Sequence, residues 1–376
     1  MRLGVGIVGI VLIAAIIWDA FEALVLPRRV TRRLRPTRWF YRSTWGVWSA
    51  IARRLRQGGR RETYLSFYGP LSLFLLLAMW AASLIIGFGM LHWASGSSLV
   101  VQGAGATFWD DLYMSGTTFF TLGLGDVVPR RSLARVLTVV EGGVGFGFLA
   151  VVIGYLPVLY QAFARREVSI TLLDARAGSP PSAGELLRRN GRDTQALAQL
   201  LHEWERWSAE ILESHLSYPV LGYFRSQHDN QSWLAALTAI LDSCALVIVA
   251  IEGACARQAQ LTFAIARHAA VDLAQVLGAP PGASVGDRLP PAAYARLRSR
   301  LGEDGVILAG GAAAEARFAA LRRMYEPYVT ALAARLLMPL PEWDASAAGD
   351  NWRTSAWERR VTNGGALGER DVHDDA

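Results

Sequence analysis

Three long apolar stretches dominate the first half of the chain. They cover residues 3–26, 64–93 and 133–163, and each is long enough to cross the roughly 30 Å hydrocarbon core of a bilayer as a helix. Residues 107–120 are also apolar but too short to cross. The pattern predicts three transmembrane helices, with a short helix between the second and the third. A cleaved signal peptide is the alternative for residues 3–26, although no small-residue cleavage site follows them.

The second half of the chain has a different pattern. Beyond residue 167, Ala, Leu, Arg and Glu recur at helical spacing, which predicts a helical domain. Its helices are expected near residues 184–190, 194–215, 230–277, 290–302 and 311–337. Two prolines and an acidic end predict a disordered tail over residues 339–376.

Residues 234–254 are ambiguous, because they are apolar enough to form a fourth span. They contain Asp242 and Glu252, and each acid costs about 2.5–3.5 kcal/mol at the centre of a bilayer. Their apolar residues also recur at the three-four spacing of a bundle seam. We therefore favour a bundle helix in the helical domain over a membrane span.

Positive charge is concentrated in one segment. All 38 basic residues are arginines, and twelve of them fall in residues 28–61 without a single acid. The same segment carries a helical stripe made of Tyr41, Trp45, Trp48 and Leu55. Aromatic residues on one face, with arginine on the others, are typical of a helix lying in the membrane interface. The apolar stretches on both sides argue against a nucleic-acid-binding segment.

The arginine segment predicts the orientation of the chain. Arginine-rich loops stay in the cytoplasm, so the segment and the helical domain are expected there, with residues 95–131 outside. Asp19 and Glu22 lie near the inner end of the first span, and we expect them to pair with the arginine segment. The net charge of +6 comes entirely from this segment, because the rest of the chain has 26 arginines and 32 acids and is therefore net negative.

Several classes of chemistry find no support in the sequence. The absence of lysine excludes a P-loop and a Schiff-base enzyme. No nucleophile–base pair, metal-ligand spacing or Gly-x-Gly-x-x-Gly motif after a strand is present, so we expect neither an enzyme nor a cofactor. His202, His215 and His228 are interpreted as structural histidines. Cys244 and Cys255 would lie about 16 Å apart on one helix, too far for a disulfide, and are expected to be reduced.

The one motif with specific chemistry lies between the second and third spans. Thr107, with Asp110 three residues later, is a capping signal for a short helix that should run to about Phe119. The sequence Thr-Leu-Gly-Leu-Gly-Asp follows directly at residues 121–126. Glycines in alternate positions accept backbone angles that other residues avoid.

This arrangement resembles the pore loop of potassium channels, in which a short pore helix precedes a Thr-Val-Gly-Tyr-Gly-Asp filter. The resemblance covers roughly residues 64–165. It implies that main-chain carbonyls of Thr121, Leu122, Gly123 and Leu124 from four chains replace the hydration shell of K⁺. The expected filter residues are Thr121, Leu122, Gly123, Leu124, Gly125 and Asp126. The expected pore-support and gating residues are Tyr113, Thr117, Thr118, Glu141 and Gly145.

The resemblance also implies specific roles. Tyr113 matches an aromatic residue that holds the filter acid in the family, so we predict a Tyr113–Asp126 hydrogen bond. Gly145 falls where the family has an inner-helix hinge, although close helix packing is the competing explanation. Glu141 either faces the cavity and attracts cations, or pairs with Arg135 or with another helix.

The motif departs from the family at several positions. Leu122 and Leu124 replace the filter valine and tyrosine, and Leu124 lacks the hydroxyl that braces the filter from behind. Phe120 replaces a threonine, and Thr117 stands where some members have a buried glutamate. These departures leave strict K⁺ selectivity open. Since only one such motif is present, a fourfold pore needs four chains.

We therefore expect an all-α membrane protein with three transmembrane helices, a re-entrant pore helix and filter loop, and a cytoplasmic helical domain. The expected function is passive K⁺ transport across a bacterial inner membrane by a homotetramer, with an unknown cytoplasmic regulator. The alternatives are a weakly selective cation channel and a membrane-anchored scaffold with a non-conducting loop. The expected segments are the first transmembrane helix (1–27), the basic interfacial segment (28–62), the pore domain (63–165), the helical domain (166–338) and the tail (339–376).

Overall fold

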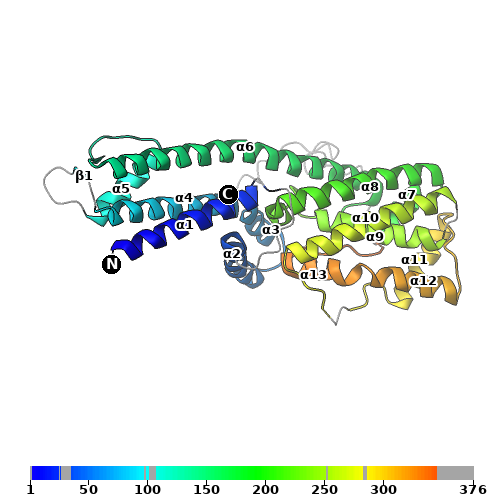
Figure 1. Cartoon of the computed structure of the whole chain (residues 1–376). Helices are drawn as coiled ribbons and strands as arrows, with labels where there is room; N and C mark the ends of the chain where they lie inside the picture. Colours follow the sequence, from blue (N-terminus) through cyan, green and yellow to red (C-terminus); the bar gives the residue numbers. More distant parts are fainter. Residues whose placement is uncertain are drawn as a thin grey trace, which may run out of the picture.

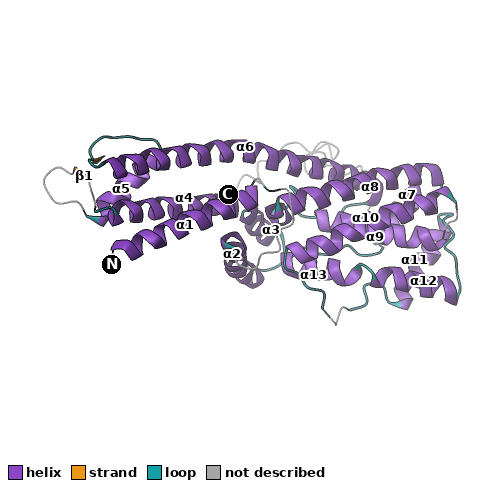
Figure 2. Cartoon of the chain, in the orientation of Figure 1, coloured by secondary structure: helices purple, strands orange, loops and turns teal. Residues whose placement is uncertain are grey.

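The computed structural model describes residues 2–24, 26, 35–96, 99–100, 107–250, 253–282 and 286–344. Within them the chain is mostly helical, as expected (Figure 2). Four helical stretches are long and apolar enough to cross a membrane: Arg2–Leu24, Gly59–Ala94, Ser132–Ala177 and Trp233–Ala250. They correspond to the three predicted spans and to the ambiguous segment.

Three long helices lie side by side at one end of the molecule (Figure 1). They are α1 (Arg2–Leu24), α4 (Tyr68–Ala94) and the first half of α6 (Ser132–Ala177). The short helix α5 (Phe108–Phe119) lies at their far end, beside a pair of short antiparallel strands. Leu99 of β1 (Leu99–Val100) pairs there with Pro129 of β2 (Val128–Pro129).

Glycines bring α1 and α4 into close contact. A Cβ atom on Gly9 would lie 2.8 Å from the carbonyl oxygen of Gly87, and one on Gly87 would lie 2.6 Å from Cγ1 of Ile13. The absence of side chains at these two positions therefore lets the helix backbones approach closely, as small residues do between membrane helices.

The two acids of the first span pair with the arginine segment, as predicted. Nε of Arg35 lies 3.3 Å from Oε2 of Glu22 and 3.8 Å from Oδ1 of Asp19. Asp19 also accepts hydrogen bonds from the backbone N–H of Thr37 and from Nε1 of Trp80, both at 3.0 Å. These bonds attach the end of α1 to the start of α2 (Pro36–Arg54) and to α4. Arginines 28, 29, 32 and 33 lie outside the described residues.

The aromatic stripe of the arginine segment faces protein, which corrects the interpretation that it lies against lipid. Trp45 is buried and donates from Nε1 to the carbonyl of Arg335, 2.9 Å away. The Tyr41 ring stacks on Tyr223, and Trp48 stacks on Tyr64. A ring with a polar edge gains both packing and a hydrogen bond in such a site. The uncovered face of α2 instead carries Arg38, Trp39, Arg42, Val47, Ile51, Arg53 and Arg54.

Helix α6 is longer than the predicted third span. It runs without a break from Ser132 to Ala177, past Pro157 and past the expected end at residue 163. The boundary expected between residues 165 and 166 therefore falls inside one helix. Figure 1 shows α6 along one edge of the molecule, from α5 into the helical domain.

The helical domain contains the predicted helices with two corrections. Its helices are α7 (Ala183–Asn190), α8 (Thr194–Ser217), α9 (Trp233–Ala250), α10 (Ala254–Val276), α11 (Pro291–Glu303), α12 (Ala312–Arg323) and α13 (Glu326–Leu336), with a 3₁₀ turn η1 (Pro219–Tyr223). The helix expected over 230–277 is two helices, because Gly253 adopts φ 86°. The helix expected over 311–337 is also two, since Pro327 lies in the first turn of α13 and cannot occupy a helix interior.

Helix α9 lies inside the helical domain, in agreement with the favoured interpretation of residues 234–254. Of its most apolar stretch, 89% is buried within the protein. Asp242 is fully buried and receives bonds from both Nη atoms of Arg288, at 3.1 and 2.8 Å, and from the Tyr325 hydroxyl. Burial works against the charge of Arg288, but the nearby Asp242 carboxylate outweighs it and raises the pKa of Arg288. Glu252 lies outside the described residues.

The end of the described chain is packed, which shortens the predicted tail. Trp343 is buried, and its carbonyl accepts a hydrogen bond of 2.8 Å from the backbone N–H of Gly184. The carbonyl of Pro341 accepts from Arg288 at 3.0 Å. Residues 339–344 therefore belong to the helical domain, and the rest of the predicted tail lies outside the described residues. Both cysteines are free and buried.

Candidate functional site

The short helix α5 positions the candidate filter loop, residues 121–126. Its start carries the predicted capping box. The Thr107 side chain accepts from the backbone N–H of Asp110, and the Asp110 side chain accepts from the backbone N–H of Thr107. At its other end, the carbonyl of Thr118 accepts from the backbone N–H of Thr121 at 3.0 Å, and that of Thr117 accepts from Leu122 at 2.8 Å. Thr117 and Thr118 thus hold the first residues of the loop through their main chains.

The backbone of the loop alternates in handedness. Thr121, Gly123 and Gly125 have φ values of 57°, 58° and 80°, whereas Leu122 and Leu124 are not among the described residues with positive φ. Glycine accepts such angles without steric cost, as predicted. A β-branched residue at positive φ is an outlier, and such strain collects at functional sites. The angle of Thr121 was not foreseen, because no glycine marks the position.

The predicted Tyr113–Asp126 hydrogen bond is present. The Tyr113 hydroxyl donates to Oδ2 of Asp126 at 2.9 Å, and Oδ1 accepts from the backbone N–H of Val127 at 3.1 Å. Asp126 therefore links α5 to the exit of the loop. Beyond it, Nε of Arg135 donates to the Pro129 carbonyl at 3.4 Å.

Leucine side chains make the loop surface unusually apolar. Leu122 and Leu124 are 61% and 63% exposed, and the neighbouring Phe120 is 58% exposed. One chain by itself thus leaves the loop uncovered. The side chain at position 124 has no hydroxyl with which to brace the loop.

Glu141 pairs with other helices and is not turned to an open surface. It is fully buried, with Oε2 lying 3.2 Å from Nε2 of His92 in α4 and Oε1 bonded to the hydroxyl of Ser115 in α5. Of the alternatives weighed from the sequence, pairing with another helix is the one that the structure contains. His92 and Ser115 were not foreseen, since neither belongs to a recognisable motif.

Gly145 lies where α6 touches the end of α5. A Cβ atom there would be 2.1 Å from the Phe119 carbonyl oxygen and 2.8 Å from its carbon. No side chain fits at this contact, because the atoms it would meet belong to the backbone and cannot rotate away. Close packing therefore explains this glycine without a hinge.

A buried arginine attaches α6 to the helical domain. Arg166 donates to Nε2 of His215 at 3.2 Å and to the carbonyls of Leu221 and Phe224 at 2.9 and 3.0 Å, and it pairs with Glu167 at 2.8 Å. Arginine can only donate, so Nε2 of His215 is an unprotonated acceptor. Burial, and then the charge of Arg166, hold the pKa of His215 well below its usual value.

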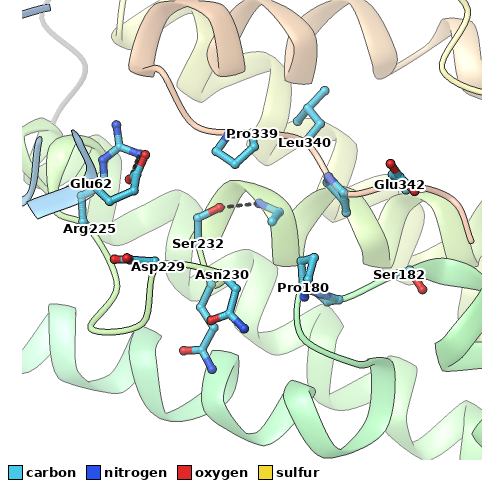
Figure 3. Close-up of a pocket in the computed structure, with 14 residues that line it drawn as sticks. Glu62, Pro180, Ser182, Arg225, Asp229, Asn230, Ser232, Pro339, Leu340 and Glu342 are labelled. Carbon is cyan, nitrogen blue, oxygen red and sulfur yellow. Dashed lines mark hydrogen bonds and ion pairs between the residues drawn. The ribbon is translucent and has the colours of Figure 1, made fainter. Parts of the chain in front are cut away.

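A cavity of about 390 Å³ lies between the loop after α6, the start of α9 and the segment after α13 (Figure 3). Glu62 of α3 (Gly59–Ser66) and Arg225 pair across 3.2 Å at one end of it. Burial lowers the pKa of Arg225 to about 10, against the attraction of Glu62. Arg225 also donates to the carbonyls of Leu336 and Leu337, at 2.5 and 3.3 Å. Its guanidinium is thus occupied by the protein itself and attaches α3 to the end of α13.

The remaining candidate histidines lie apart from the loop. His202 is exposed and lies 3.4 Å from Glu205, and His228 is exposed as well. In the described part of the chain, no group of three His, Cys, Asp or Glu side chains is placed to hold a metal ion.

Comparison with known proteins agrees with the fold around the loop. Residues 74–161 match the model of a family described as ion channels. This stretch contains most of α4, all of α5, the loop and the first part of α6. Over this stretch the chain is thus similar to an ion channel domain, which points to a channel rather than an enzyme.

One relative adds a membrane context. Over 189 residues the chain is 27% identical to a Bacillus subtilis (strain 168) protein named uncharacterized membrane protein YdjJ. The match covers 49% of this chain and 54% of the relative, so the chain spans about half of the relative's length. No solved structure matches the chain.

Proposed function

We propose that this protein is a potassium-selective channel that lets K⁺ pass down its gradient across the bacterial inner membrane. The observation that carries the proposal is the alternating handedness of residues 121–125, directly after a capped short helix and between two long apolar helices. Successive carbonyls can serve as ion ligands on one side of a chain only if alternate residues take such angles.

Four copies of the chain form the proposed pore, with three membrane spans each: α1, α4 and α6. The loop occurs once per chain, and its leucines are uncovered in a single copy. A ring of four loops supplies carbonyls of Thr121, Leu122, Gly123 and Leu124 to each ion, with α5 as the re-entrant pore helix. Asp126 and Tyr113 stabilise the outer mouth.

The helical domain lies on the cytoplasmic side in this proposal. The support is the arginine segment, since arginine-rich loops remain in the cytoplasm. The uncovered face of α2 then meets the lipid headgroups with Trp39, Val47 and Ile51 beside its arginines.

Ion flux from liposomes tests the function. The purified protein should carry a current whose reversal potential follows the K⁺ gradient when K⁺ and Na⁺ gradients oppose each other. Gly123→Val should abolish this current, because a β-branched side chain is strongly disfavoured at φ 58° and the loop already holds one such residue at Thr121. Gly278→Val is the matched control: φ is 66°, no atom lies within 4 Å, and the position follows α10 in the helical domain. An equal loss in both variants would argue against a role for the loop.

A weakly selective cation channel is the second candidate. It is favoured by Leu124, which provides no hydroxyl to brace the loop. A measurable current whose reversal potential does not change with the K⁺ gradient would support this candidate and overturn K⁺ selectivity. If neither K⁺ nor Na⁺ flux is detected, both channel functions are overturned, and a membrane-anchored scaffold becomes the favoured function.

A further inference from the structure

One fully buried polar cluster joins α4, α5 and α6. It consists of His92, Ser115 and Glu141, whose exposed fractions are 1%, 0% and 0%. Each residue comes from a different helix. Besides Glu141, the Ser115 hydroxyl lies 2.7 Å from the carbonyl oxygen of Ile85 in α4. A single hydroxyl therefore lies within hydrogen-bond distance of two acceptors.

The number of protons decides how these contacts can be made together. A serine hydroxyl has one hydrogen. If Ser115 donates it to the Ile85 carbonyl, the contact with Glu141 needs a hydrogen on the carboxyl group. A neutral Glu141 supplies that hydrogen, and its other oxygen then accepts from Nε2 of His92. Every contact in the cluster is then a hydrogen bond.

The second nitrogen of His92 argues for the same state. Nδ1 is buried and has no hydrogen-bond partner among the described residues. An ion pair with Glu141 would need a protonated imidazole, which would place an unpartnered N–H at Nδ1. A buried donor without a partner is costly. A neutral imidazole and a neutral acid avoid both this cost and a separated charge at membrane depth.

The cluster lies just ahead of the residues that hold the loop. Ser115 precedes Thr117 and Thr118, whose carbonyls bind the start of the loop, by two and three residues. On the other side of the loop, α6 leaves β2 and reaches Glu141 after about two and a half turns. A shift of α5 relative to α6 therefore displaces both ends of the loop.

We propose that His92 and Ser115 are positioning residues which, together with a neutral Glu141, hold α5 in register with α4 and α6 and so hold the filter. The proposal rests on the proposed channel function, because positioning is read out through the pore. It predicts that the hydrogen-bonding pattern of the cluster matters and that a negative charge on Glu141 does not.

Conservative and disruptive variants distinguish a role for the hydrogen-bonding pattern from a role for the negative charge of Glu141. Glu141→Gln keeps an acceptor for His92 and a donor for Ser115, so K⁺ flux from liposomes and the K⁺/Na⁺ permeability ratio should fall far less than in Glu141→Ala. Glu141→Ala leaves His92 without its partner, and flux should fall by about tenfold or more, as expected for unpaired buried polar groups. His92→Gln should rescue what His92→Ala loses, because its amide donates at a similar reach.

Serine offers a matched control pair. Ser115→Ala removes the hydroxyl that joins α5 to α4 and α6, and it should lower flux and the permeability ratio. Ser83→Ala removes a hydroxyl of α4 whose one bond within the described part of the chain goes to the Met79 carbonyl in its own helix, 2.7 Å away. It should leave both unchanged. Equal effects of the two substitutions, or a loss in Glu141→Gln as large as in Glu141→Ala, would overturn the positioning role.

Infrared spectroscopy reads the proton directly and does not depend on flux. The difference spectrum between wild type and Glu141→Gln at neutral pH should contain the carbonyl band of a protonated carboxyl group. Ser115→Ala should shift this band, because one of its hydrogen bonds is lost. Carboxylate bands in its place would overturn the neutral cluster. If the wild type carries no flux, the proposed function fails, while the infrared result still decides the state of the cluster.

Discussion

Glu141 in α6 and Asp242 in α9 are both fully buried acids in long apolar helices, yet the regions around them differ. Glu141 meets a histidine and a serine, whereas Asp242 meets an arginine and a tyrosine. In the most apolar stretch of α6 only 11% is buried by the chain, compared with 89% in α9. Two helices of similar composition thus lie in different surroundings.

The comparison shows that the composition of an apolar helix does not predict whether protein or lipid will cover it. Helix α9 is enclosed by its own chain, and its acid is neutralised by an arginine that the chain also supplies. Helix α6 is covered on one face only, along the line of Glu141, Gly145, Leu159 and Arg166. Its other face needs lipid or further copies of the chain, since exposed Val139, Phe146 and Ile153 would otherwise contact water.

The largest effect is expected at the covered face of α6. Gly145→Ala places a Cβ atom against the Phe119 backbone, and overpacking of this kind costs about 1–3 kcal/mol or more. K⁺ flux should disappear, and the protein should melt at lower temperature in detergent. Both follow from displacement of α5.

Gly143 is the control for this substitution, because no atom of another described helix or loop lies within 4 Å of its Cβ position. Gly143→Ala should leave the covered face intact and retain flux. A flux-competent Gly145→Ala with altered opening only would favour a hinge and contradict close packing.

The second effect concerns the acid of the enclosed helix. Asp242→Asn leaves the buried Arg288 with Glu326, 3.5 Å away, as its counter-charge in place of the closer two-point pair, which should reduce the free energy of unfolding of the helical domain by up to about 3–5 kcal/mol. Chemical denaturation of the full chain, followed by circular dichroism, measures the loss. Asp344→Asn breaks a half-exposed pair with Arg300 and should cost less than about 1 kcal/mol. Similar losses in the two variants would contradict the view that Asp242 is a core residue.

The third effect is a pH dependence at the junction of the two regions. His215 binds its proton far less readily when folded than at its unfolded pKa of about 6.5. Below that value the unfolded state holds more protons, so the free energy of unfolding falls as pH falls, by up to about 1.4 kcal/mol per pH unit. Stability curves between pH 7 and 5 should show this slope, and His215→Gln should remove it. The exposed His202→Gln is expected to keep it; a slope unaffected by His215→Gln would assign the effect elsewhere.

The smallest effect is expected at the surface of the same junction. Arg176 of α6 and Glu203 of α8 pair across 3.2 Å, but their side chains are 43% and 53% exposed. Glu203→Gln should change the free energy of unfolding by less than about 1 kcal/mol, and added salt should erase the difference. A larger loss would mean that the surface pair, rather than buried Arg166, attaches α6 to the helical domain.

Local features of the sequence predicted much of the site. The capping box at Thr107 and the end of the helix near Phe119 follow from short-range chemistry and were confirmed. The bond between Tyr113 and Asp126 was also confirmed, although it came from resemblance rather than from spacing. The left-handed angle of Thr121 was missed, because a β-branched residue carries no local signal for it.

Contacts between distant segments escaped prediction. The Trp45 indole finds its acceptor at Arg335, 290 positions along the chain, so its stripe could be taken for a lipid-facing one. His92 and Ser115 are unremarkable in their own helices and gain a role only where they meet Glu141. The break before α10 depended on one glycine at positive φ inside an otherwise continuous helical pattern.

The sequence by itself determined which segments are helical and apolar, where the arginines gather, and that one Thr-Leu-Gly-Leu-Gly-Asp loop follows a capped short helix. These properties depend on hydrophobic periodicity, charge and glycine, all of which act over a few residues. Only the tertiary structure decided which apolar helix is enclosed by protein, which partner each buried acid takes, and why Gly145 has no side chain. Those outcomes depend on the burial of polar groups between distant helices, where an unpaired group is costly and a single methyl group does not fit.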